Sequence, residues 1–214
     1  MSIKLTGATS GSIELDVPAA VSGGDISLTL PNGVGSVNQV LQNGSTPGTL
    51  EFAPGGKILQ VKSTVRANRV SSSNFVFRDA LTVNITPTSA SSNMLVYAFM
   101  HLGSTAAYGM YVRLRRDSTD ISGALGDADG NRPAVTAHAN SYDDTSTVSQ
   151  YQINPTTIVY YDTDISTTSQ VTYKAQIASY QGQTTYVNRS YTFQDTAEYD
   201  GTPISTLTVM EVAA

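Results

Sequence analysis

The sequence has no cysteine and little charge, and both absences narrow the classes of protein that it can encode. Without cysteine, the chain forms neither disulfides nor metal sites with thiolate ligands. Only 14% of the residues are Asp, Glu, Lys or Arg, well under the usual quarter. The net charge is −5, whereas nucleic-acid binding needs clustered Lys and Arg, and Asp117 and Asp120 directly follow the basic cluster of residues 113–116. We therefore expect no nucleic-acid partner.

Long apolar runs are absent too. No run reaches the about 18 residues that a membrane-spanning helix needs. The first 15 residues, MSIKLTGATSGSIEL, lack the apolar core of a signal peptide. The sequence thus predicts that the protein does not insert into a membrane. It also predicts that the protein is made in a reducing cytoplasm. A cysteine-free protein that acts outside a cell needs another source of durability, and burial between subunits is the simplest one.

Straight-chain helix formers are also scarce, with four Lys and four Glu in the whole chain. Thr, Val, Ile and the 12 Tyr residues favour the pleated, half-buried surface of a β-sheet. The composition therefore predicts an all-β protein. The one place where a single helical turn is expected is residues 38–42.

Composition shifts once along the chain, near Pro54–Gly56. Residues 1–56 carry little charge, and Gly or Pro interrupts their short alternating stretches, residues 12–17, 26–30 and 49–52. Such short strands do not bury a core of their own. Either this segment is a linker, or it obtains a core from identical neighbours. The residues that would meet across such an interface are Leu28, Leu30, Val40, Leu41, Leu50 and Phe52.

From Lys57 onward, longer stretches alternate apolar and polar residues, as strands with one buried face do. Residues 94–101, MLVYAFMH, are apolar on both faces, which is typical of a central strand. About eight strands separated by clusters of Asn, Asp, Gly and Pro predict a β-sandwich over residues 57–214. They are expected at residues 58–65, 81–86, 94–101, 110–115, 158–161, 171–178, 186–193 and 206–212.

The sequence predicts no catalytic site, no cofactor and no metal. Residues 127–131, DADGN, begin like a calcium-binding loop. However, Arg132 stands where that loop needs Gly, and His138 stands where an acid should complete the ligands. A polar turn is one interpretation, and a weak surface cation site remains the alternative.

Other acidic pairs and the two histidines are interpreted structurally. Asp143–Asp144 and the pair Asp162 and Asp164 are expected in solvated loops, although either pair could ligate a hard cation. His101 ends an apolar stretch, so we expect it in the core or at an interface. No Gly-x-Ser-x-Gly motif is present, and the few Glu residues argue against a glycosidase. We therefore expect no enzyme.

Tyrosines are concentrated in the second half of the chain. Aromatic rings beside Asn, Asp and Gln suit sugar recognition, because the ring stacks on a pyranose and the amides bind hydroxyls. The same residues suit protein interfaces and ordinary packing, so both interpretations stay open. The candidates for contact with a receptor are Tyr142, Tyr151, Tyr180 and Tyr199.

Residues 28–52, LTLPNGVGSVNQVLQNGSTPGTLEF, resemble a module of tail-fibre and other appendage proteins of tailed, especially marine, bacteriophages. The upstream GSIELDVPAA fits the same pattern, and the final STLTVMEVAA resembles the closing strand of phage fibre-tip domains. Between them, GKILQVKST and RLRRDSTDISGALGDADGNR resemble the opening strand and a central hairpin of such tips. The resemblance covers nearly the whole chain. It departs from long fibres, which carry far more chain before the tip.

The resemblance implies an attachment and trimerisation module at residues 1–56 and a jelly-roll-like antiparallel β-sandwich at residues 57–214. It implies a homotrimer on the outside of the virion, held by another virion protein and able to touch a host-surface glycan or protein. Three functions remain open. The chain is a short tail fibre or fibre tip for host adhesion, a capsid decoration or head fibre, or a carbohydrate-binding module unrelated to phages.

Overall fold

The computed structural model describes residues 3–6, 12–15, 28–36, 39–46, 48–54, 57–105, 108–140 and 149–214. Two compact units make up the chain, Met1–Gly55 and Gly56–Ala214. The described residues are mainly antiparallel strands, and their helical structure is limited to the short 3-10 turns η1 (Ser122–Ala124) and η2 (Ser149–Tyr151). The predicted all-β fold is therefore confirmed. Within these ranges, no helix has the length and apolar character to cross a membrane.

The N-terminal unit contains two separate two-stranded sheets. One pairs β1 (Ile3–Thr6) with β2 (Ser12–Leu15), and the other pairs β3 (Gln39–Asn43) with β4 (Leu50–Pro54). The helical turn expected at residues 38–42 is thus wrong. Residues 39–43 are extended because each of them pairs with a residue of β4. Helix propensity within residues 38–42 contains no information about this pairing.

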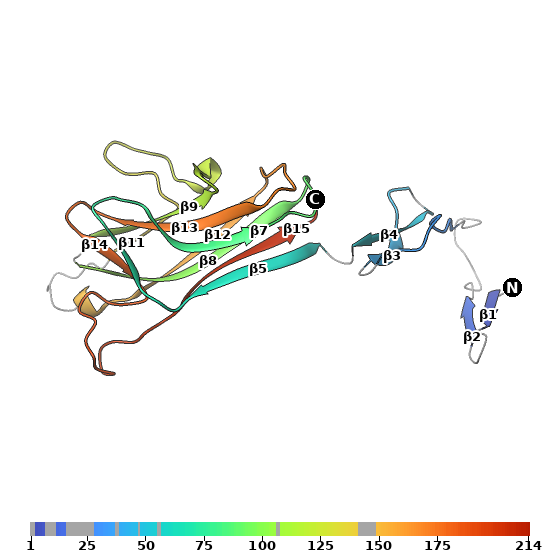
Figure 1. Ribbon diagram of the computed structural model, residues 1–214. Coiled ribbons are helices and arrows are strands. Elements are labelled where there is room, and N and C mark those ends of the chain that lie inside the picture. The colour runs from blue at the N-terminus through green and yellow to red at the C-terminus, as the bar shows by residue number, and fades with distance from the viewer. Residues whose placement is uncertain are drawn as a thin grey trace, which may run out of the picture. The chain divides into compact units, whose positions relative to one another are not determined.

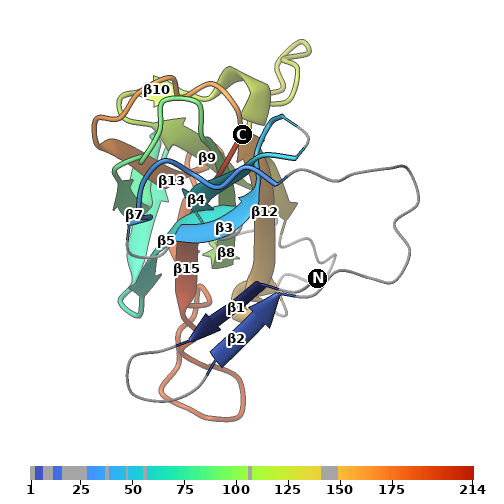
Figure 2. The ribbon, with the colours of Figure 1, turned by 90° about the vertical axis from the view of Figure 1, so that its right-hand side faces the viewer.

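The second unit is a sandwich of two antiparallel sheets, which Figure 1 shows from the side and Figure 2 from the end where β5 begins. The five-stranded sheet contains β7 (Arg78–Ile85), β9 (Gly109–Arg116), β10 (Thr119–Asp120), β11 (Ala137–Asn140) and β13 (Val171–Ser179). The six-stranded sheet contains β5 (Ile58–Arg66), β6 (Val70–Ser73), β8 (Asn93–Ser104), β12 (Asn154–Asp162), β14 (Thr184–Val187) and β15 (Ser205–Val212).

The strand β8 is the centre of the six-stranded sheet. It pairs with β12 along one edge, and with β15 and then β14 along the other. Its inward side chains, which include Val96, Ala98 and Met100, are fully buried against the five-stranded sheet. The apolar character of residues 94–101 on both faces thus correctly predicts a central strand.

The sandwich has two distinct ends. At the base, where β5 begins and β15 ends, the Lys57 carbonyl accepts a hydrogen bond of 2.7 Å from the Ala213 N–H. At the distal end, β8 stops at Ser104 and β9 starts at Gly109. The loops that follow β13 and β14 lie at this distal end as well (Figure 1).

The expected strand at residues 186–193 is only partly right. The strand β14 ends at Val187, because Asn188 has a φ of 61° and turns the chain out of the sheet. Three further strands of the sandwich, β6, β10 and β11, were not predicted. They hold only four, two and four residues, too few for a two-residue period to be visible in the sequence.

Asp162, expected in a solvated loop, is buried in the sandwich. Arg116 donates hydrogen bonds of 2.8 Å to both of its carboxylate oxygens, and the Tyr173 hydroxyl donates one of 2.6 Å. Burial and then the Asp162 carboxylate raise the pKa of Tyr173, so its hydroxyl stays protonated and remains a donor. Because β12 belongs to one sheet and β9 and β13 to the other, this cluster joins the two layers. The Asp164 side chain is 92% exposed, as expected for a solvated loop, and its carboxylate lies 3.7 Å from the Arg116 guanidinium.

Replacing Asp162 by Asn should lower the free energy of unfolding by about 2 kcal/mol, because the Arg116 guanidinium loses the buried carboxylate at 2.8 Å and keeps only the exposed Asp164 carboxylate at 3.7 Å. Urea unfolding followed by circular dichroism measures the change. The matched control is Asp164→Asn, which should stay within about 0.5 kcal/mol of the unsubstituted protein. Equal losses in the two variants would contradict this role of the buried cluster.

Glu211 is a second buried carboxylate, near the base of the sandwich. It accepts hydrogen bonds of 2.6 Å from the Gln60 amide and of 2.7 Å from both the N–H and the hydroxyl of Thr88. Burial by itself raises the pKa of Glu211, but the hydrogen bonds from Gln60 and Thr88 outweigh it and hold the pKa below its usual value. The ionised carboxylate therefore fixes the loop after β7 onto β15.

A depressed pKa makes the stability of the sandwich depend on pH. The contribution of Glu211 is present above the pKa of glutamate in the unfolded chain, about 4.3. It is lost as the pH falls from there through the lower pKa of the folded state. Unfolding free energies measured between about pH 6 and pH 3 should thus fall less steeply for Glu211→Gln than for the unsubstituted protein. Parallel pH profiles would show that Glu211 is not the titrating group.

Candidate functional site

The residues predicted to serve oligomerisation lie in the β3–β4 hairpin or in the segment that bridges to it. In its register, Val40 lies opposite Ala53, and Leu41 lies opposite Phe52. Leu28 and Leu30 flank Thr29, which forms a parallel bridge with Thr49 at the start of β4. All six predicted residues therefore belong to one small arrangement of backbone segments: Leu28, Leu30, Val40, Leu41, Leu50 and Phe52.

Most of these apolar side chains are open to solvent. Leu28 is 62% exposed and Leu30 is 68% exposed, and Val40 and Leu41 are exposed as well. Leu50 and Phe52 are half-buried. An exposed set of this size in so small a unit is the pattern expected of a surface that another chain covers.

The Gly35 backbone packs directly on the Phe52 ring. A Cβ atom added at Gly35 would lie 2.6 Å from Cδ1 of Phe52, inside any permitted contact. Gly33, in the same turn, has open space around it. Only the second glycine of the GVG triplet is therefore required for the turn to close over Phe52.

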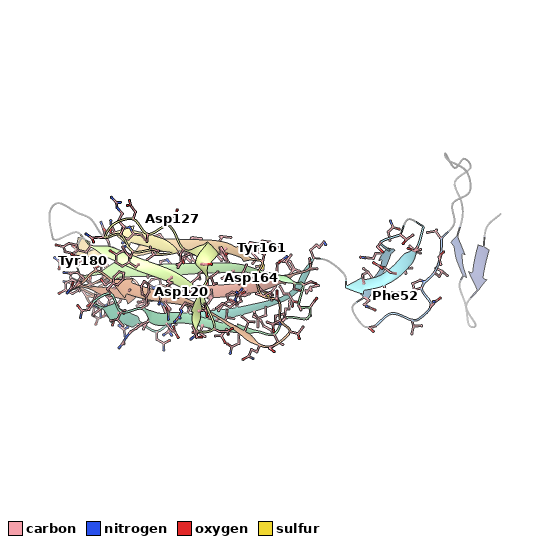
Figure 3. All side chains as sticks on the ribbon, turned by 90° about the horizontal axis from the view of Figure 1, so that it is seen from above. Phe52, Asp120, Asp127, Tyr161, Asp164 and Tyr180 are labelled. Carbon is pink, nitrogen blue, oxygen red and sulfur yellow. The ribbon has the colours of Figure 1, made fainter. Side chains whose placement is uncertain are left out.

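The predicted receptor-contact tyrosines that the structure describes all lie at the distal end of the sandwich. Tyr180 is in the turn between β13 and β14, Tyr151 is in η2, and Tyr199 is in the long loop after β14. Figure 3 shows Tyr180 at one end of the sandwich, with Tyr161 and Asp164 toward the other. Tyr142 lies outside the described residues, as do Asp143 and Asp144.

These tyrosines form ring pairs. The Tyr180 ring stacks on Tyr108 with 5.3 Å between the centroids, and the Tyr151 ring lies 5.3 Å from Tyr199. The backbone N–H of Tyr180 donates to the Gly109 carbonyl at 3.2 Å, which holds the turn beside the start of β9. Tyr108 was missed by the sequence analysis because its partner is 72 residues away in the chain, and no local pattern connects them.

A row of further aromatic rings, also not predicted, continues from this pair. Phe75 packs edge-on against Phe77 and Tyr111, with centroids 5.6 and 5.3 Å away, and Tyr111 stacks on His138 at 5.2 Å. Burial and the neighbouring Tyr180 phenol raise the pKa of Tyr111. We refer to Phe75, Tyr108, Tyr111, His138 and Tyr180 as the distal aromatic surface.

An unusual turn positions this surface. Asn74 and Phe75 have φ values of 57° and 49°, and the side-chain oxygen of Asn74 accepts a hydrogen bond of 2.9 Å from the Gly182 N–H. A bulky residue such as Phe75 rarely adopts a positive φ. The contacts of this turn with the Tyr180 turn therefore hold the Phe75 ring at the surface. The only local feature of the sequence that indicates this aromatic surface is the apolar FVF at residues 75–77, which lies between polar stretches.

A hollow of about 290 Å³ lies in the loop after β14, among residues 193–197 and 200–202. The guanidinium of Arg69 lies 4.3 Å from the Phe193 ring centroid, and Asp200 accepts hydrogen bonds from the Ser190 hydroxyl and the Gln194 N–H. The loop thus places carboxylate, amide and aromatic groups close to the Tyr151–Tyr199 pair. Such groups suit the recognition of hydroxyl-rich ligands.

The remaining sequence candidates are accounted for by local contacts. Arg132 forms an ion pair with Asp129 across the DADGN turn. Within the described ranges, no group of three or more His, Asp and Glu side chains could hold a metal ion. His101 is half-buried on β8, where its Nδ1 lies 2.8 Å from the Ile204 carbonyl oxygen.

No protein-family model matches the sequence, and no curated protein matches it. The similar solved structures include proteins of infectious bursal disease virus. The T13 viral particle is 14% identical with a TM-score of 0.36, over 82% of this chain and 40% of that one. The VP2 subviral particle is 11% identical with a TM-score of 0.34, over 95% and 47%. The Gx strain structure is 12% identical with a TM-score of 0.32, over 82% and 37%.

This chain therefore spans less than half the length of those viral proteins. The likeness is too weak to carry an argument about function. None of the three is a phage tail-fibre protein, so the fibre resemblance stays a prediction from the sequence.

Replacing Gly35 by Ala should loosen the N-terminal unit, because the added methyl group collides with the Phe52 ring. Hydrogen exchange measured by mass spectrometry should show faster exchange in residues 39–54, with no change in the sandwich strands. Gly33→Ala is the control and should exchange like the unsubstituted protein. Unchanged exchange in Gly35→Ala would mean that the turn does not depend on this contact.

Proposed function

We propose that the chain is a virion structural protein, specifically a short tail fibre or fibre-tip subunit that adheres to the host surface. The observation that carries the proposal is the gathering of Tyr108, Tyr151, Tyr180 and Tyr199 at the distal end of the sandwich. The chain enters the sandwich at Lys57, at the base. Attachment and contact with a receptor are thus assigned to opposite ends of one domain.

The chemistry of the distal end supports adhesion. Tyrosine provides a large contact area with little loss of side-chain entropy, and its hydroxyl binds polar groups. Tyr180 and Tyr199 are both largely exposed, while their ring partners hold them in place. Preorganised rings of this kind suit a host-surface glycan or protein. The proposal involves recognition alone, with no cofactor and no catalysis.

The N-terminal unit supports the attachment half of the proposal. Its exposed Leu28, Leu30, Val40 and Leu41 are assigned to contacts between three copies and with another virion protein. A homotrimer carries three adhesive ends, one on each chain, so weak single contacts add up to firm attachment. The main alternative, a capsid decoration or head fibre, uses the same oligomer and differs only in what the N-terminal unit binds.

The location of the chain on the particle tests the proposal. Antibodies against the sandwich should label the tail of intact virions in electron micrographs. Labelling on the head would instead support the capsid decoration or head fibre. A protein absent from virions would reject both assignments and leave the carbohydrate-binding module.

Adhesion by the purified protein should depend on the distal tyrosines. Tyr180→Ala should reduce binding to host cells or their isolated surface glycans about tenfold, because one stacking contact is lost. Tyr180→Phe is the matched variant, and it should keep most of the binding because the ring stays on Tyr108. Binding that is identical in the three proteins would place the receptor contact elsewhere.

A further inference from the structure

The outer face of the six-stranded sheet is apolar across four strands. The residues Tyr161, Leu95, Met210 and Val61 lie opposite one another on β12, β8, β15 and β5. The next two rows across the same strands are Val159, Tyr97, Thr208 and Ser63, and then Thr157, Phe99, Thr206 and Val65. We call these twelve residues the apolar face. None of them is charged.

Much of the apolar face is open to solvent. Val61 is 52% exposed, Val65 is 61% exposed and Val159 is 62% exposed, and the Tyr97 and Tyr161 rings are exposed as well. These side chains point away from the core, because the alternate residues of the same strands are the ones that face it. An extended exposed patch of this kind marks an interaction surface in a soluble protein.

The opposite layer has the reverse character. On the outer face of the five-stranded sheet, Arg113 and Arg115 both form ion pairs of 2.8 Å with Asp120, and Lys174 lies 3.2 Å from Asp79. That face carries paired charges and is suited to water. The sandwich therefore has one outer face with paired charges and one whose twelve central residues carry no charge.

We propose that the apolar face packs against the same face of further copies of this chain. The inference rests on the homo-oligomer of the proposed function and adds where in the sandwich its subunits meet. A flat, uncharged face is complementary to itself, because no like charges meet when a symmetry axis brings copies together. Its only polar side chains are hydroxyls, and those of Ser63 and Thr208 already bond each other at 2.8 Å.

The size of the face shows how much of a subunit interface it can supply. Four strands at about 4.8 Å spacing and five residues of each strand at about 3.4 Å give the twelve-residue face a footprint of about 330 Å². Two such faces cover about 650 Å² of the about 1,000 Å² that a specific interface needs, so the apolar face contributes to the oligomer together with the N-terminal contacts of the proposed function. Face-to-face sheets also pack well in general, as in the interior of any sandwich.

The test places a charge on each edge strand of the face in the full chain. Val159→Lys on β12 and Val61→Lys on β5 should each raise the dissociation constant of the oligomer at least about 100-fold, because a lysine is buried without a partner. Sedimentation at a fixed protein concentration should then show a larger share of the 22.6 kDa monomer than the unsubstituted protein does. Asn84→Lys, exposed on the outer face of β7, is the control and should keep the oligomer.

The absence of cysteine allows a second, independent measurement. Tyr97→Cys, at the middle of the apolar face, should be joined between copies by a short bis-maleimide, whereas Asn84→Cys should not. This readout still applies if a lysine variant fails to fold. Equal cross-linking of the two cysteine variants would overturn the inference.

The possible results separate this inference from the proposed function. A dissociation constant that neither lysine substitution changes, in an oligomer that dissociates with Leu41→Asp, would overturn the apolar face as the interface and leave the N-terminal attachment intact. A protein that is monomeric without substitution would overturn the interface. Adhesion and location on the virion are measured separately, so either can hold or fail independently of the interface.

Discussion

The fold depends on one constraint, the position of β8 at the centre of the six-stranded sheet. Three strands pair with it, so it has no free edge along most of its length. Its inward residues, such as Met100 and Leu102, fill the space between the sheets. Its outward residues, Leu95, Tyr97 and Phe99, are equally apolar and meet no second layer within the described sandwich. One strand therefore contributes to the core and also to the exposed apolar face.

The outer faces of the two sheets differ in charge, so the two sides of the sandwich are not equivalent. Ion pairs lie on the outer face of the five-stranded sheet, whereas the twelve residues of the apolar face on the six-stranded sheet carry no charge. Between the layers, Asp162 and Arg116 tie β12 to β9, so the two faces are held in a fixed relation. In the interface proposed above, the charged layer faces solvent and the apolar layer faces other copies.

A second asymmetry runs along the strands. The base receives the chain at Lys57, and the distal end carries the stacked pairs of Tyr108 with Tyr180 and Tyr151 with Tyr199. Loops provide the aromatic rings, while the rigid strands beneath them provide the positions. The N-terminal unit has its own uncovered leucines, so both units expose the kind of surface that assembly buries. An adhesive appendage needs both properties, a surface that is buried on assembly and an exposed end that contacts the receptor.

The sequence by itself determined the all-β class and the central place of residues 94–101, because strand periodicity and apolar content are local properties. It also named three of the tyrosines that gather at the distal end. Only the tertiary structure decided that Asp162 is buried, since its partners Arg116 and Tyr173 come from other strands. Likewise, no local pattern reveals that four strands align their apolar residues into one exposed face. Register and long-range pairing determine such features, and they exist only once the chain has folded.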